Sequence, residues 1–244
     1  MKKNILKITV FIASVALMLG ACSKDNDEPG NPTNNKTTAV FNPKITYGRM
    51  TDQEGNIYKT VTIGTQTWMA ENLRTTKYND GTSIPKINIS TEWSALNTGA
   101  YCNFKNIEDV DAIATFGRLY NWYAVNTGKL APTGWHVPTD AELTTLITYL
   151  GSENVAGGKL KETGNTHWAN PNNGATNEIG FTALPGGLCN VNGTYEHIQY
   201  YGYWWCSTGG ENSSWCLDVS YLGNEVFISG KNKKSGLSVR CIKD

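Results

Sequence analysis

Charged residues are scarce in this chain, and the charges that are present cancel. Only 17% of the 244 residues are charged, and 21 basic residues offset 21 acidic ones. A balanced surface of this kind gives no electrostatic footprint for nucleic acid or for an anionic membrane. We therefore expect neither a nucleic-acid partner nor an electrostatic attachment to lipid.

Sequence patterns for metal and hydrolytic chemistry are also missing. No CxxC pair and no histidine cluster with ligand spacing occurs, and the three histidines, His136, His167 and His197, are scattered. Zinc is therefore not predicted. The chain has no HExxH motif and no serine nucleophile elbow. We predict no catalytic residue, no metal site and no resident cofactor.

The N-terminus carries the pattern of an export signal. Lys2 and Lys3 precede an apolar run from Ile5 to Leu19, which is too short for a good membrane-spanning helix. Small residues and then Cys22 follow, an order that resembles the bacterial lipobox. In lipobox proteins the signal is removed just before the cysteine, which is then lipidated. We predict that residues 1–21 are absent from the mature protein and that Cys22 is the lipid attachment site.

The segment 22–44 has the composition of a flexible tether. Ser23–Glu28 is polar and acidic, and Pro29–Thr38 is rich in glycine, proline, asparagine and threonine. Such a segment buries too little apolar surface to offset its ordering entropy. An acidic patch directly after the lipidated cysteine resembles the surface-export signal of lipoproteins in the Bacteroidetes. We expect an outer-membrane protein that faces the cell exterior and touches the membrane through its lipid anchor alone.

The body of the chain, residues 45–244, begins with mixed strand and helix patterns. Residues 57–63 alternate apolar and polar side chains, which predicts a half-buried strand. Residues 115–125 place apolar side chains close to helical spacing. Thr139 and Glu142 fit a capping box before an apolar face of period 3.6, which predicts a second helix up to residue 150.

The last third of the chain reads as short strands between glycine-rich turns. The predicted strands are Phe181–Leu184, Trp204–Ser207, Trp215–Val219, Glu225–Ile228 and Ser238–Cys241. Two helices followed by antiparallel strands form an α+β arrangement.

Eight motifs occur in a fixed order along this body. They are Tyr58–Gly64, Trp68–Leu73, Gly117–Val125, Gly134–Asp140, Gly174–Glu178, Gly180–Gly187, Trp204–Thr208 and Ser238–Cys241. Together they resemble the Fibrobacter succinogenes major paralogous domain family, in register from about Ile45 to Asp244. More distantly, that family resembles the C-type lectin-like fold shared with formylglycine-generating enzymes. The resemblance implies two helices packed on a small twisted antiparallel sheet with long loops. It implies no chemistry, because function on a shared fold lives in its sites.

Five cysteines follow the predicted anchor: Cys102, Cys189, Cys206, Cys216 and Cys241. Disulfides persist outside the inner membrane, and an odd count leaves one thiol free or bonded to another molecule. Cys206 and Cys216 lie on a predicted hairpin within disulfide reach, although the family usually has serine at position 206. The resemblance implies a second bond, Cys102–Cys241, because the C-type lectin fold often ties its first helical region to its last strand. Cys189 is then unpaired, and Cys189–Cys206 and Cys189–Cys216 remain as alternatives.

Aromatic side chains near the predicted sheet are the main ligand-binding candidates. They are Tyr203, Trp204, Trp205 and Trp215. Sugar rings stack on exposed aromatic faces. Because alternate residues of a strand point inward, at least one of Trp204 and Trp205 should belong to the core.

A polar pair, Asn177–Glu178, is the second binding candidate. Calcium-dependent lectin motifs are absent from the chain, and this pair is the nearest substitute, so calcium is considered only here. These observations favour a non-catalytic binding or adhesion module whose partner is a glycan or a cell-surface protein. The alternative is a divergent enzyme of the formylglycine-generating type, or an accessory subunit in polysaccharide breakdown.

Overall fold

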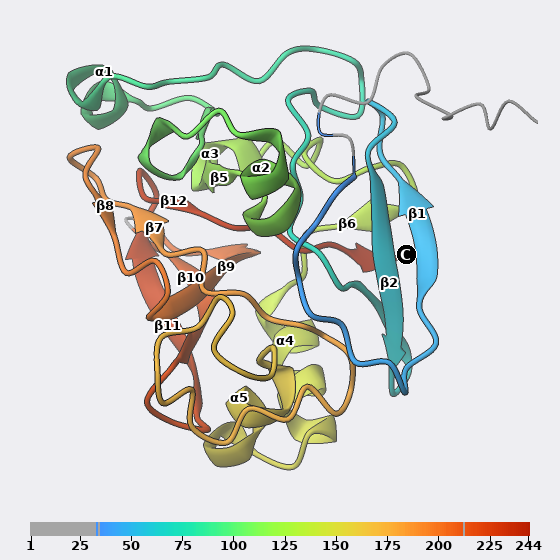
Figure 1. The fold of residues 1–244 in the computed structure, drawn as a ribbon. Coiled ribbons are helices and arrows are strands. Elements are labelled where there is room, and N and C mark those ends of the chain that lie inside the picture. The colour runs from blue at the N-terminus through green and yellow to red at the C-terminus, as the bar shows by residue number, and fades with distance from the viewer. Residues whose placement is uncertain (1–32, 34, 212) are drawn as a thin grey trace, which may run out of the picture.

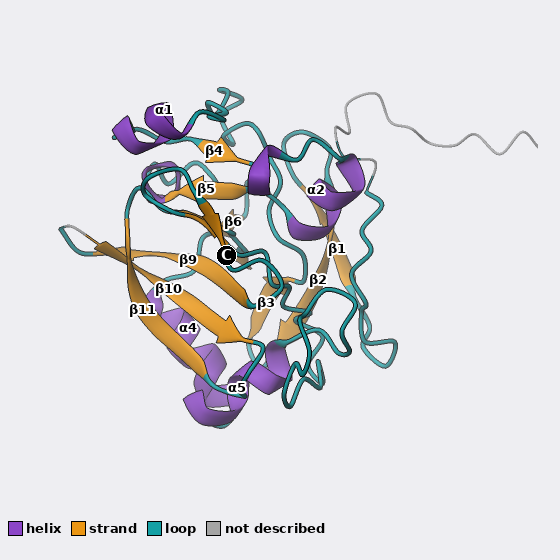
Figure 2. Ribbon diagram, turned by 60° about the vertical axis from the view of Figure 1, so that its left-hand side comes forward, coloured by secondary structure: helices purple, strands orange, loops and turns teal. Residues whose placement is uncertain are grey.

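The structure is a computed structural model that describes residues 33, 35–211 and 213–244 (Figure 1). The predicted signal peptide and the predicted lipid site at Cys22 lie outside the described residues. Strands form two five-stranded sheets and one three-stranded sheet. Figure 2 shows α1 and α2 at one end of the molecule and α4 and α5 at the other, with the strands between them.

The first sheet joins the start of the domain to its end. Its order is β1 (Gly48–Thr51), β2 (Ile57–Ile63), β3 (Gln66–Met69), β13 (Ile242–Lys243), β6 (Trp135–His136), all antiparallel. The predicted strand over residues 57–63 is confirmed: Val61 and Ile63 are buried, whereas Thr62 between them is exposed. Ile242 pairs with Trp68 on one side and His136 on the other, so the C-terminal strand joins β3 to β6 in this sheet.

The second sheet has three long strands. They are β9 (Tyr201–Gly209), β10 (Ser213–Ser220) and β11 (Val226–Asn232), with β10 in the centre. Leu217 pairs with Trp204 on β9 and with Ile228 on β11. The β9–β10 register shifts between Ser214 and Cys216, where β9 has a bulge.

The third sheet consists of short strands brought together from distant parts of the chain. Its order is β4 (Tyr101–Cys102), β5 (Leu119–Asn121), β12 (Gly236–Leu237), β7 (Leu188–Cys189), β8 (Tyr195–Glu196). All pairs are antiparallel.

The helices are short. They are α1 (Ser90–Ala95), α2 (Val110–Phe116), α3 (Trp122–Val125), α4 (Asp140–Tyr149) and α5 (Glu153–Leu160), with a 3-10 turn at Phe104–Asn106. The predicted capping box of α4 is confirmed: the Thr139 amide donates to Glu142 Oε2 at 2.8 Å, and the Glu142 amide donates to Thr139 Oγ1 at 3.3 Å. Glu142 is therefore a capping residue.

The predicted fold class, α+β with two helices packed on one small twisted antiparallel sheet in the manner of C-type lectins, is wrong. The described chain is mostly β, with three sheets, two of them curved as half-barrels, and only 18% helix. The pattern over residues 115–125 is misleading because Gly117 ends α2 with a φ of 73°. The following residues, Leu119–Asn121, then pair with β4 and β12 as strand β5.

Two of the predicted strands are single bridges instead. Residues 181–184 contribute one bridge, between Ala183 and Lys161, and residues 238–241 contribute one, between Ser238 and Trp204. Arg240 joins these two segments. Its buried guanidinium donates to the carbonyls of residues 181 and 182, whereas the carbonyls of residues 238, 239 and 241 accept from the backbone amides of Trp205, Leu73 and Met69.

Candidate functional site

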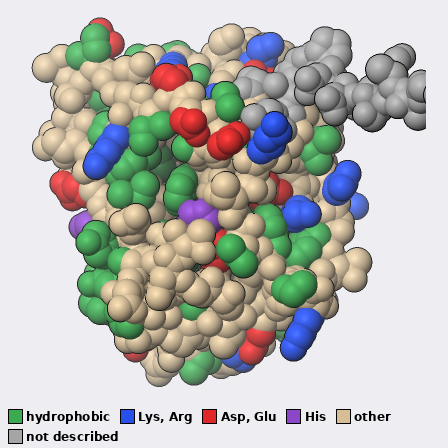
Figure 3. All heavy atoms as spheres, viewed as in Figure 1, with side chains coloured by type: hydrophobic (Ala, Val, Ile, Leu, Met, Phe, Trp, Pro, Cys, Tyr) green, Lys and Arg blue, Asp and Glu red, His purple; other side chains and the backbone are tan. Residues whose placement is uncertain are grey.

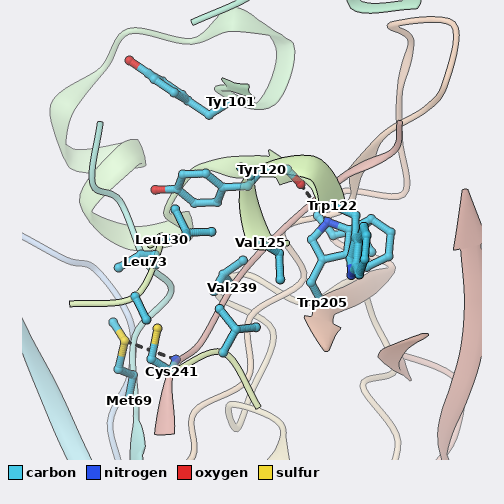
Figure 4. Packing of buried hydrophobic residues seen from close by; sticks show 14 of the residues in the cluster. Met69, Leu73, Tyr101, Tyr120, Trp122, Val125, Leu130, Trp205, Val239 and Cys241 are labelled. Carbon is cyan, nitrogen blue, oxygen red and sulfur yellow. Dashed lines mark hydrogen bonds between the residues drawn. The ribbon is translucent and has the colours of Figure 1, made fainter. Parts of the chain in front are cut away.

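Trp204 and Trp205, two of the predicted binding residues, are both core residues. They are 3% and 0% exposed. Trp205 Nε1 donates to the Tyr120 carbonyl at 2.7 Å (Figure 4), and Trp204 Nε1 donates to Asn72 Oδ1 at 2.8 Å. The two rings belong to different hydrophobic clusters, one on each face of β9. Neither ring is open to a ligand.

Trp215 is 43% exposed and lies on the same side of the second sheet as Trp204. It pairs with Gly230 on β11, whereas its neighbour Cys216 pairs with Trp205 and Ser229 on the opposite face. The predicted aromatic candidates therefore do not converge on one surface.

A different aromatic surface is present on the other face of the second sheet. We call it the aromatic face, and it consists of His197, Tyr201, Tyr203, Asp218, Phe227, Ser229 and Lys231. Cross-strand partners share a face, and Asp218 pairs with both Tyr203 and Phe227. The alternate residues Tyr201, Ser229 and Lys231 then fall on this side as well.

Aromatic rings form the apolar half of this face. The rings of Tyr201 and Tyr203 stack with centroids 5.7 Å apart and planes 11° apart. The His197 ring lies 5.0 Å from Tyr201, and its Nδ1 is 3.0 Å from the Tyr203 hydroxyl. Phe227 is 58% exposed. Tyr203 itself is buried, so it supports the half-exposed ring of Tyr201.

A charged group borders the rings. Ser229 Oγ donates to Asp218 Oδ2 at 2.7 Å, and Lys231 Nζ lies 3.4 Å from the same oxygen. The Lys231 ammonium also lies 4.9 Å from the centroid of the Tyr203 ring, a cation–π contact. Burial, followed by the nearby Asp218 carboxylate, raises the pKa of Tyr203, so its hydroxyl stays protonated and available to His197. The face thus combines apolar rings with hydrogen-bonding groups at their edge.

The sequence pattern does not single out Phe227, Ser229 or Lys231. Residues 226–228 are consecutively apolar, so alternation does not show which side chain is exposed. The polar residues Ser229 and Lys231, spaced by two from Phe227, were the only available indication of its side.

Asn177 and Glu178, the second predicted binding pair, have separate structural roles. Asn177 is buried with a φ of 46°; its Oδ1 accepts from the Thr182 amide at 2.8 Å, and its Nδ2 donates to Thr182 Oγ1 at 3.0 Å. Glu178 Oε1 lies 3.1 Å from Lys159 Nζ at the surface. Asn177 therefore fixes the loop through its hydrogen bonds to Thr182. It does not share a calcium site with Glu178. Over residues 33, 35–211 and 213–244, no group of three His, Cys, Asp or Glu side chains is placed to hold a metal ion.

Neither predicted disulfide is formed. All five cysteines in the described chain, Cys102, Cys189, Cys206, Cys216 and Cys241, are free and buried. Cys216 pairs with Trp205 on β9 and packs on that side, so Cys206, the next residue along β9, faces the other side of the sheet and packs with Trp204. Cys102 and Cys241 belong to different hydrophobic clusters. Cys102 instead has Cys189 as its neighbour, within hydrogen-bonding reach.

A carboxylate–imidazole–hydroxyl series attaches the N-terminal segment to the body. His167 Nδ1 lies 2.8 Å from Glu162 Oε2, and His167 Nε2 lies 3.0 Å from Thr38 Oγ1. The Thr38 amide donates to Thr115 Oγ1 at 2.9 Å, and the Val40 amide donates to Glu162 Oε1 at 2.5 Å. Two backbone amides share this network with the hydroxyl, so its role is attachment of the segment. The later part of the predicted tether is therefore bonded to the domain.

The surface in the orientation of Figure 1 is electrostatically mixed. Figure 3 shows acidic and basic side chains interspersed on this side, with hydrophobic side chains around a hollow. Within the described ranges, no helix has the length and apolar character required to cross a bilayer.

The fold and the aromatic face define a mostly-β protein whose three-stranded sheet carries aromatic rings next to hydrogen-bonding groups. The Fibrobacter succinogenes major domain matches residues 61–243. The chain belongs to this family. No curated protein matches the chain, and no solved structure matches it.

Proposed function

We propose that this protein is a non-catalytic binding module, lipid-anchored through Cys22 to the outer membrane and displayed outward, whose aromatic face binds a glycan. The observation that carries the proposal is the exposed Phe227 ring on the same face of the sheet as the stacked Tyr201 and Tyr203, with Asp218, the partner of Lys231, on the strand between them. A pyranose ring has an apolar C–H face and a rim of hydroxyls. Its C–H face suits the rings, and its hydroxyls suit the Lys231 ammonium, which the buried Asp218 carboxylate holds in place, and the His197 imidazole.

The enzyme alternative has less support. It required Cys206 and Cys216 to act as a reactive pair, and these thiols point to opposite faces of the second sheet. Burial raises the pKa of the Cys216 thiol, and the neighbouring Asp218 carboxylate raises it further. A protonated, buried thiol is a poor nucleophile and a poor metal ligand.

A glycan array with the purified protein tests the proposal. We expect binding to at least one glycan class, with Phe227→Ala and Tyr201→Ala each weakening it by about tenfold or more, as truncation of a central aromatic contact does. We expect the same binding in EDTA as in calcium, because Asn177 is occupied by Thr182.

Trp215→Ala is the matched control. Trp215 is an exposed aromatic residue on the same sheet but on the opposite face, so its removal should leave the affinity unchanged. Loss of binding in Trp215→Ala with full binding in Phe227→Ala would assign the site to the other face. Binding to a cell-surface protein and to no glycan would overturn the glycan assignment.

A further inference from the structure

Cys102 and Cys189 face the same side of the third sheet, although they lie on different strands. Cys102 pairs with Leu119 on β5, and Asn121, two residues along β5, pairs with Gly236 on β12. Gly236 in turn pairs with Cys189 on β7. Cross-strand partners and alternate residues share a face, so both thiols project from one side.

Gly236 lets Cys189 and Trp93 pack closely against the third sheet. A Cβ atom at Gly236 would lie 3.1 Å from Cys189 Cβ and 3.0 Å from Trp93 Cζ2, tighter than ordinary packing. A bare glycine therefore lets the side chains around it approach one another. Tyr195, the strand partner of Cys189, reaches the residues that follow Cys102: its ring centroid lies 5.5 Å from that of Phe104, and its hydroxyl donates to Asn106 Oδ1 at 2.7 Å. The Cys189 side chain lies within hydrogen-bonding reach of Cys102, and both residues belong to one cluster with Trp93 and Phe104.

We propose that Cys102 and Cys189 form a disulfide when the chain folds under oxidising conditions. The oxidant is an exchangeable disulfide, such as oxidised glutathione or the active-site disulfide of an exported oxidoreductase. One cysteine thiolate attacks it and expels one thiolate, which leaves a mixed disulfide; the second cysteine thiolate attacks that bond and expels the other. The protein loses two electrons and two protons, and the oxidant gains both as two thiols.

The bond forms before the core closes. Cys102 and Cys189 are fully buried in the folded chain. Burial, reinforced by the neighbouring Cys189, raises the pKa of the Cys102 thiol well above its ordinary value. Exchange needs a thiolate with access to an oxidant, so the folded and reduced protein reacts slowly. Oxidation in the cell rests on the proposed function, because export places the folding chain outside the inner membrane.

Refolding of the full mature chain in detergent tests the pair directly. One sample refolds with reduced and oxidised glutathione and another with dithiothreitol. Both are then denatured, alkylated and mapped by peptide mass spectrometry. We expect a Cys102–Cys189 linked peptide only in the glutathione sample, with Cys206, Cys216 and Cys241 alkylated in both. Alkylation of Cys102 and Cys189 in the glutathione sample, or a different linkage, would overturn the inference.

Thermal unfolding provides a second readout that does not depend on peptide recovery. We expect the oxidised wild type to melt on the order of 10 °C above the reduced protein, because the bond closes a long loop. Cys102→Ala and Cys189→Ala should each abolish this redox difference, and the double variant should add nothing. Cys206→Ala, which removes a different buried thiol, should keep the full difference. Equal redox differences in all these variants would contradict the pair.

Protein recovered from outer-membrane fractions separates this inference from the proposed location. The linked peptide in both the refolded and the cell-derived samples supports both. The linked peptide after refolding, with reduced cysteines in the cell, supports the pair and counts against export.

Discussion

At the scale of single residues, buried cations join the loops of this protein. Lys161 is completely buried, and its Nζ donates to the carbonyl oxygens of Asn173 at 2.8 Å, Ser220 at 2.9 Å and Gly223 at 2.7 Å. Burial lowers the pKa of Lys161 to about 8, so at neutral pH the ammonium form occupies the site. One side chain thus satisfies carbonyls from three points of the chain. In the unfolded chain water would solvate these carbonyls. Each of them therefore needs a hydrogen-bond donor in the folded protein.

Replacing this amine by an apolar side chain of similar length should be costly. We expect Lys161→Met to lower the free energy of unfolding by about 3 kcal/mol at pH 7, because three carbonyls lose a buried, charged donor. Urea denaturation followed by tryptophan fluorescence measures the change. Lys159→Met is the matched control two residues away: Lys159 makes only a surface ion pair with Glu178, so its loss should cost under about 1 kcal/mol. Equal losses in the two variants would show that the carbonyls are satisfied without Lys161.

At the scale of elements, one glycine decides where a helix stops and a strand begins. Gly117 follows α2 with φ 73° and ψ −160°, a conformation that residues with a Cβ rarely adopt. A Cβ at this position would lie 2.6 Å from Asn72 Cβ and 2.8 Å from the Leu73 carbonyl oxygen. Both backbone conformation and close packing therefore require glycine, and the chain turns into β5 instead of continuing the helix.

Gly117→Ala tests this requirement. We expect it to lower the free energy of unfolding by about 3 kcal/mol, from backbone strain together with the clash. Gly128→Ala serves as the comparison, because Gly128 also has a positive φ, 67°, but has no atom within 4 Å of the added Cβ. Its cost should be about 1 kcal/mol, from the backbone alone. Calorimetry of both variants gives the two values. A Gly117→Ala protein no less stable than Gly128→Ala would remove the packing argument.

At the scale of the whole molecule, both ends of the described chain are fastened to the domain. The C-terminal strand β13 sits between β3 and β6 in the first sheet. Thr38 and Val40, in the N-terminal segment, bind the His167–Glu162 pair. A lipid anchor at Cys22 would thus be joined to the domain by a segment that is itself bonded to the domain at Thr38.

Cell fractionation tests the predicted anchor. We expect the wild-type protein to incorporate labelled palmitate, to remain in the outer-membrane fraction and to be degraded when protease is added to intact cells. Cys22→Ala should lose the label and leave the membrane fraction, whereas Ser23→Ala should behave as wild type. Labelled Cys22→Ala protein would place the lipid elsewhere. A wild-type protein degraded only after lysis would assign it to an inward-facing position.

Local patterns predicted the parts of the fold that depend on neighbouring residues. The α4 cap was predicted from Thr139 and Glu142 because its hydrogen bonds span only three residues. Strand β2 was predicted from the alternation over residues 57–63, although Tyr58 and Thr60 on one face are buried as well as Val61 and Ile63 on the other. The fold class and the helix over residues 115–125 were wrong, since Leu119–Asn121 finds its partners on β4 and β12, which are distant in sequence. Periodicity over short apolar runs does not distinguish these outcomes.

The sequence by itself determined the family, the α4 helix and strand β2, because these depend on motifs and on bonds between near neighbours. The tertiary structure alone decided which aromatic rings are exposed and which thiols are neighbours. A one-residue change of strand register moves a side chain to the other face of a sheet. Cys216 is paired with Trp205, so Cys206 faces the other side of the sheet, and long-range packing puts Cys102 and Cys189 into one cluster. Phe227 is open to solvent while Trp205 is buried, since long-range pairing, not side-chain type, assigns each residue its face.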